Sequence, residues 1–221
     1  MMQDVKKCLR LFKYGHQMKG NVFCMIFFIC LGVLYSGMGT DMLHQCALYI
    51  FLGFILPIQS WHSNLYAGLV ASSPKRRAVE IYAMDVAQTI AAIISSGIFL
   101  LVAYIAKEFG QNEPTEISIV SYETSLVISG LTIICIMVFM ACGYKYLWIP
   151  LIIFTGGICG CFVLLTKASI RNSLNALLQG RTGLAVLLFL LEVAAGLVLA
   201  GIFRRVFYRK DFNKASMRFV S

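Results

Sequence analysis

Six long apolar stretches are the feature that most restricts how this chain of 221 residues can fold. Each stretch is close to the ~20 residues that an α-helix needs to cross a hydrocarbon core of about 30 Å. The sequence therefore predicts an all-α integral membrane protein with six transmembrane helices. The stretches are Asn21–Gly39, Leu43–Ser60, Val86–Ala106, Thr124–Cys142, Leu147–Thr166 and Gly183–Phe203.

The composition excludes a water-soluble domain. Apolar residues make up 59% of the chain and charged residues 13%, whereas about 25% of the residues in a typical soluble domain are charged. Disorder is excluded as well, because disordered chains combine low hydrophobicity with high charge density. The connections between the apolar stretches are short. Any ATPase or catalytic domain that this protein uses must therefore lie inside the bundle or on another chain.

The positions of Lys and Arg predict that both termini face the cytoplasm. With the N-terminus inside, 15 of the 19 basic residues fall on the inner side and four on the outer side. Cytoplasmic loops of membrane proteins carry this kind of excess. The net charge of +9 is therefore a topology signal, and nucleic acid is not an expected partner, since no soluble basic surface with interleaved aromatic residues is present.

The N-terminal segment has the pattern of an amphipathic helix. Its apolar residues recur at i, i+3, i+4 and i+7 with Lys and Arg between them, which is typical of a helix lying in the inner membrane interface. Either a simple anchor or an additional contact with a cytoplasmic partner fits this pattern. A cleaved signal peptide is disfavoured, because the apolar run that follows is longer than usual. The predicted organisation is an interfacial helix at 1–20, a transmembrane domain at 21–203 and a basic cytoplasmic tail at 204–221.

The loop between the second and third stretches, at about 72–86, has a strong helix start. Ser73 can cap a helix, and Pro74 fits its first turn because the missing N–H is not needed there. Three basic residues follow at 75–77. Arg76 and Glu80 lie four residues apart and could form a weak, exposed ion pair. We predict a short, rigid, basic helix at the cytoplasmic surface, or more simply an anchor for the third span.

The small–small–Pro–x–x–Arg pattern of Ser72–Arg77 resembles the membrane subunits of ABC-2 type exporters. In that family the corresponding loop forms a coupling helix that docks on an ATP-binding subunit. The amphipathic N-terminal helix, the six spans, the cytoplasmic termini and the length are similar too. The resemblance covers the whole chain as architecture, but only residues 72–86 as a motif. The residues that it assigns to the ATPase-subunit interface are Ser73, Pro74, Lys75, Arg76, Arg77, Glu80 and Tyr82.

The resemblance implies a permease subunit in a bacterial plasma membrane. An ATP-binding cassette subunit on a separate chain would hold ATP and Mg²⁺, and a second copy or a homologous subunit would complete the translocation path. Half-size permeases that export amphipathic peptides are similar in length. This chain carries no P-loop motif of its own, so we expect it to bind no cofactor.

Two other function classes are weighed against export. A substrate-capture component of a vitamin or metal importer also has about six spans and lacks ATPase motifs, but its polar pocket does not suit spans poor in His, Asp, Asn and Arg. A membrane-embedded enzyme would need paired acids, a Ser–His couple or a metal triad. The eight Cys and three His show no C-x-x-C pair or His pair at helical spacing, so neither an enzyme nor a metal site is predicted.

Two features lie within the predicted spans. Glu192 is deep in the sixth span, where a charge costs at least about 2.5–3.5 kcal/mol. It is a candidate for the translocation path, or alternatively for a hydrogen bond to a neighbouring span. Gly156 and Gly160 form a G-x-x-x-G face in the fifth span, which permits close helix packing. Packing inside one subunit is favoured over a homodimer seam.

Two segments are expected on the outer side. The loop at 107–123 contains four Glu and one Lys, so its charge of −3 would favour cationic material near an exit, although a plain solvated loop is preferred. The segment at 167–181 has apolar residues at helical spacing and Gly180 near its end, which predicts a short amphipathic helix. In ABC-2 membrane subunits, short external helices lie between the last two spans.

Overall fold

The protein is a helical bundle in a computed structural model that describes residues 18–39, 42–65, 77–109, 120–142 and 148–208. These residues form helices and turns and contain no strand, which confirms the predicted all-α class. The elements are α2 (Met18–Ser36), α3 (Leu43–Leu65), the π-helix η3 (Ala78–Ala83), α5 (Met84–Phe109), α6 (Tyr122–Cys142), α7 (Trp148–Thr166), α8 (Ala168–Leu178) and α9 (Thr182–Phe207).

Each predicted apolar stretch corresponds to a long helix of its own, although α2 ends at Ser36 rather than Gly39, and residue 147 lies outside the described part of the chain. Within the described ranges, four helices (α2, α5, α6 and α9) are long and apolar enough to cross a membrane. The predicted interfacial helix falls mostly on residues 1–17, outside the described part of the chain. Its last three residues, 18–20, begin α2 instead.

Three helices continue past their predicted ends, and one of them is α5, which runs to Phe109 rather than Ala106. Helix α3 runs to Leu65 with Pro57 inside it, and α9 runs to Phe207 rather than Phe203. Arg204 and Arg205 therefore lie on a helix and not in the predicted tail. The reason is tertiary, since both side chains bond to α5, as described below.

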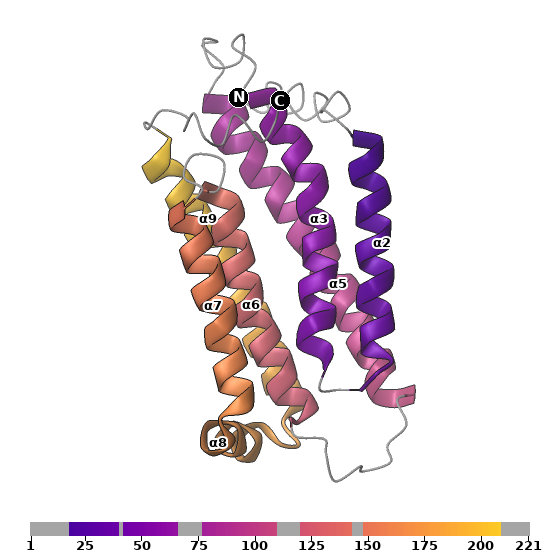
Figure 1. The fold of residues 1–221 in the computed structure, drawn as a ribbon. Helices are drawn as coiled ribbons and strands as arrows, with labels where there is room; N and C mark the ends of the chain where they lie inside the picture. The colour runs from indigo at the N-terminus through magenta and orange to yellow at the C-terminus, as the bar shows by residue number, and fades with distance from the viewer. Residues whose placement is uncertain (1–17, 40–41, 66–76, 110–119, 143–147, 209–221) are drawn as a thin grey trace.

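The long helices run up and down in sequence order, as Figure 1 shows. The start of α2 and the end of α9 lie at the same end of the bundle, while α8 lies across the opposite end. Helix α2 packs mainly on α3, and α6 packs mainly on α9, with smaller and similar contacts to α3 and α7. The bundle thus has two groups, α2–α3–α5 and α6–α7–α9, which meet chiefly where α3 contacts α6, with a smaller contact between α5 and α9.

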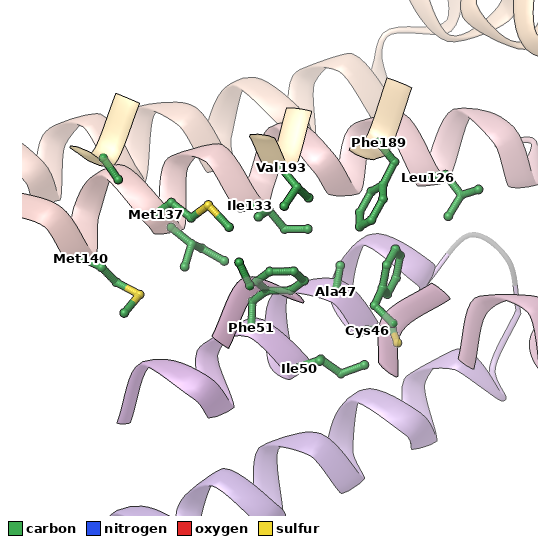
Figure 2. Packing of buried hydrophobic residues seen from close by; sticks show 14 of the residues in the cluster. Cys46, Ala47, Ile50, Phe51, Leu126, Ile133, Met137, Met140, Phe189 and Val193 are labelled. Carbon is green, nitrogen blue, oxygen red and sulfur yellow. The ribbon is translucent and has the colours of Figure 1, made fainter. Parts of the chain in front are cut away.

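Helix α6 is the centre of the bundle. The buried share of its apolar window is 72%, against 28% for those of α5 and α9 and 11% for that of α2. Figure 2 shows Ala47 and Phe51 of α3 facing Ile133 of α6 and the α9 residues Phe189 and Val193. The ring centroids of Phe99 and Phe189 are 5.2 Å apart, so aromatic packing also joins α5 to α9.

The outward faces of the helices are apolar as well. Phe23 on α2 is 71% exposed and Ile152 on α7 is 68% exposed, and other outward faces carry similar residues. Leaving so much apolar surface in water would be unfavourable, at about 25 cal/mol per Å². Apolar residues both inside and outside a bundle are the pattern expected of helices surrounded by lipid.

Candidate functional site

A cluster of charged and polar side chains joins the start of α5 to the end of α9. The Arg204 side chain is only 2% exposed. Its guanidinium donates hydrogen bonds to the Asp85 carboxylate through Nη1 and to the Gln88 side-chain oxygen through Nη2. On the outer side of the cluster, Arg205 Nη2 donates to Asp85 Oδ2 at 2.9 Å, and Arg205 Nη1 donates to the Gly201 carbonyl oxygen at 2.8 Å.

The cluster also reaches the central helix. Gln88 Nε2 donates to the backbone carbonyl oxygen of Met137 on α6 at 3.2 Å, and this bond is buried. The Asp85 carboxylate and the Gln88 amide therefore connect α5 to both α9 and α6. A buried guanidinium is tolerated only when it is paired and hydrogen-bonded, which explains why α9 stays helical to the level of Arg204.

The predicted coupling segment leads directly into this cluster. Arg77 is exposed and helical, η3 follows it, and Asp85 is the second residue of α5, with no break in the helical backbone. Residues 66–76, with Ser73, Pro74, Lys75 and Arg76, lie outside the described part of the chain. A π-helical turn widens the helix locally and is frequent at functional sites.

The prediction that Glu80 lies at an exposed site is wrong. Glu80 is fully buried, and Ile81 and Met84 beside it are 3% and 2% exposed. Tyr82, the last predicted interface residue, is half-buried. The reason is that η3 packs against both α5 and α9. Of the predicted interface residues that the structure describes, Arg77 is the one that is exposed.

A groove of about 350 Å³ opens between α5 and α9 beside the cluster. Its lining is polar at the cluster and apolar along α9. The polar lining residues are Asp85, Gln88, Thr89, Arg204 and Arg205, and the remaining ones are Leu197, Val198, Gly201 and Ile202.

Glu192 belongs to α9 and lies against α6 and close to α7. A methyl group added at Gly130 of α6 would overlap the Glu192 carboxylate, and Cys161 of α7 is close to both Glu192 and Thr132. Its Oε2 atom is buried and has no hydrogen-bond partner among the described residues. Glu192 does not line the groove between α5 and α9. Its two predicted roles, in the path or in a hydrogen bond, stay predictions.

Among the residues that the structure describes, nothing packs on the G-x-x-x-G face, contrary to the favoured prediction of packing within the subunit. Gly156 and Gly160 are exposed, and no atom of another described helix lies within 4 Å of a Cβ added at either position. Helix α7 instead approaches α6 through Gly157, where an added Cβ would overlap Cys135 Sγ. Gly157 lies on a different side of α7 from Gly156 and Gly160, because adjacent residues of a helix are about 100° apart around its axis. The alternative of a homodimer seam stays a prediction.

The opposite end of the bundle holds a second polar network. Thr182 Oγ1 of α9 donates to Glu123 Oε1 of α6 at 2.9 Å and accepts from Lys107 Nζ of α5 at 3.0 Å. The predicted solvated loop is therefore shorter than 107–123, since Lys107 and Glu108 belong to α5 and Glu123 is buried on α6.

The short helix predicted between the last two spans is confirmed as α8. It ends at Leu178, two residues before Gly180, whose φ of +74° favours glycine after a helix end. Asn175 Oδ1 of α8 accepts a hydrogen bond from the Ser121 N–H at 3.1 Å, which connects α8 to the start of α6.

The charged cluster was not anticipated from the sequence. Asp85 and Arg204 are 119 residues apart and lie at the ends of predicted spans, where charged residues are ordinary. The only available signal was an acidic residue in the first turn after the basic loop and a basic pair at the end of the last span.

Within the described ranges, no group of three His, Cys, Asp or Glu side chains could hold a metal ion. No family model, no curated protein and no solved structure matches this chain.

Proposed function

We propose that this protein is a permease subunit of an ATP-driven exporter of the ABC-2 type. In this proposal α3 and α7 cross the membrane together with the four helices of membrane length, both termini are cytoplasmic, and the end of the bundle that holds the charged cluster faces the cytoplasm. ATP hydrolysis takes place on separate ATP-binding cassette subunits. A second copy or a homologous subunit completes the path in the plasma membrane, and an amphipathic peptide is the proposed substrate.

The continuity between Arg77, η3 and α5 is the observation that carries this proposal. A loop that receives a push from an ATPase must transmit it to the membrane helices, and a helical segment without a break does so as a rigid lever. The cluster of Asp85, Gln88 and Arg204 then connects the first turns of α5 to α9 and α6. A displacement at residues 73–82 would therefore move both groups of helices.

Co-purification with an ATPase tests this function. A tagged copy is extracted from its native membrane in mild detergent, and its partners are identified by mass spectrometry. We expect a stoichiometric P-loop ATPase and no third membrane protein. An ATPase that arrives only with a separate scaffold subunit would favour the importer component, and the absence of any ATPase would refute both functions.

Charge reversal at the coupling segment should separate docking from folding. We expect Arg76→Glu with Arg77→Glu to abolish ATPase association while insertion and the unfolding temperature are retained, because Arg77 is exposed. The matched control is Arg181→Glu, an exposed arginine between α8 and α9, which should leave association intact because α8 lies at the opposite end of the bundle. Unchanged association in the double variant would make residues 72–77 a topology anchor only.

Variants at the exposed glycines Gly156 and Gly160 test whether a second copy of the chain packs on this face of α7. Gly156→Leu with Gly160→Leu should leave the unfolding temperature of the subunit nearly unchanged, because no other described helix contacts either position. If a second copy packs on this face, the dimeric fraction in crosslinking or native mass spectrometry falls. An unchanged dimeric fraction would place the subunit contact elsewhere.

A further inference from the structure

The groove between α5 and α9 combines positive charge with partial exposure. Two arginines and one aspartate line it, so one positive charge is left after Asp85 is balanced. The Arg204 side chain is buried, whereas that of Arg205 is 55% exposed. Arg205 is therefore the member of the cluster that can offer donors to a ligand in the groove.

The helix backbone makes room for this arginine. Arg205 folds back along α9 and donates to the Gly201 carbonyl oxygen. A Cβ added at Gly201 would lie 2.8 Å from Arg205 Nη1. The glycine thus allows the guanidinium to lie in the groove beside Asp85.

The same face of α9 continues as an apolar surface. Val198 and Ile202 line the groove and are 61% and 51% exposed. They precede Arg205 by seven and three residues, which places the three side chains in a row along one side of the helix. A ligand that fits this row has an anionic group at one end and an apolar chain at the other.

We propose that this groove binds an anionic phospholipid of the cytoplasmic leaflet. Its phosphate accepts hydrogen bonds from Arg205, and an acyl chain lies along Val198 and Ile202. Guanidinium groups bind phosphate through charge-assisted hydrogen bonds, and basic pockets between helices on the cytoplasmic side bind anionic head groups. This inference rests on the membrane orientation given in the proposed function.

Retention of defined lipids on the purified protein tests the site. The protein is incubated in detergent with equal amounts of phosphatidylglycerol and phosphatidylcholine, and bound lipids are counted by native mass spectrometry. The wild type should prefer phosphatidylglycerol, and Arg205→Gln should lower that preference about tenfold, as expected for one lost charge-assisted hydrogen bond. Arg205→Lys should keep most of the preference, and the control Arg181→Gln should keep all of it.

Competition with a soluble anion distinguishes a lipid from free phosphate. Glycerol 3-phosphate is added at the concentration at which phosphatidylglycerol saturates the site. It should displace little lipid, because it has no apolar chain. Full displacement by glycerol 3-phosphate, or an unchanged lipid preference in Arg205→Gln, would overturn the proposal, as would an equal loss in Arg181→Gln. The lipid assay needs no ATPase. A negative lipid result therefore leaves the proposed ATPase docking untouched, and a negative result in the ATPase co-purification leaves the lipid site untouched.

Discussion

Asp85→Asn is expected to lower the free energy of unfolding by about 3 kcal/mol. Removing one partner of a buried ion pair typically costs about 3–5 kcal/mol, because the remaining charge is left uncompensated. The lower end applies here, since the Asp85 side chain is 25% exposed while Arg204 is 2% exposed. Chemical unfolding in detergent, followed by circular dichroism, measures the change.

A matched control lies in the same cluster. Arg205→Gln breaks the other ion pair of Asp85, in which the arginine side chain is exposed. Exposed ion pairs contribute only about 0–1 kcal/mol to stability, so this variant should lower the free energy of unfolding much less than Asp85→Asn does. The double variant Asp85→Asn with Arg204→Gln should recover part of the loss, because no buried charge then lacks a partner. Equal effects of Asp85→Asn and Arg205→Gln would show that burial of Arg204 does not govern stability.

Gly130→Ala is expected to destabilise the contact between α6 and α9 by about 1–3 kcal/mol, as overpacked cores generally are. The added methyl group would overlap the carboxylate of Glu192, and the Cβ of Glu192 would also lie within 3.0 Å. Alanine is ordinarily the better residue in a helix by up to about 1 kcal/mol. A net loss of stability would therefore show that the steric conflict outweighs this helix preference.

Two further variants separate sterics from helix propensity. Gly97→Ala on α5 places its methyl group where no atom of another described helix lies within 4 Å, so this control should be neutral or slightly stabilising. In a double-mutant cycle, Glu192→Ala should rescue Gly130→Ala, because the side chain that it collides with is shortened. Additive effects in this cycle would mean that Gly130 and Glu192 do not contact each other.

The helices themselves could be predicted from the sequence, but not their places in the bundle. Hydropathy locates each apolar stretch because crossing a hydrocarbon layer needs about 20 apolar residues, whatever their neighbours are. It does not identify the central helix. Helix α9 has a higher mean hydropathy than α6, 2.6 against 2.3, yet 28% of its window is buried against 72% for α6. In lipid, core-facing and outward-facing side chains are both apolar, so composition does not distinguish them.

The small residues show the same limit. The sequence singled out Gly156 and Gly160 by their spacing, but close helix contacts occur at other glycines, among them Gly32, Gly130 and Gly157. Spacing identifies which residues share a side of one helix. Only the rotation of that helix against its neighbours decides which side is used.

The sequence alone therefore determined the helical class, the approximate limits of the long helices and the short helix α8, since these depend on local hydropathy and local capping. The tertiary structure decided the site. It paired Asp85 with Arg204 across 119 residues, buried Glu80 and Glu123, and placed Glu192 against Gly130. The pairing of Asp85 with Arg204 arises because a buried charge is tolerated where packing brings a partner to it, and packing is a property of the assembled bundle.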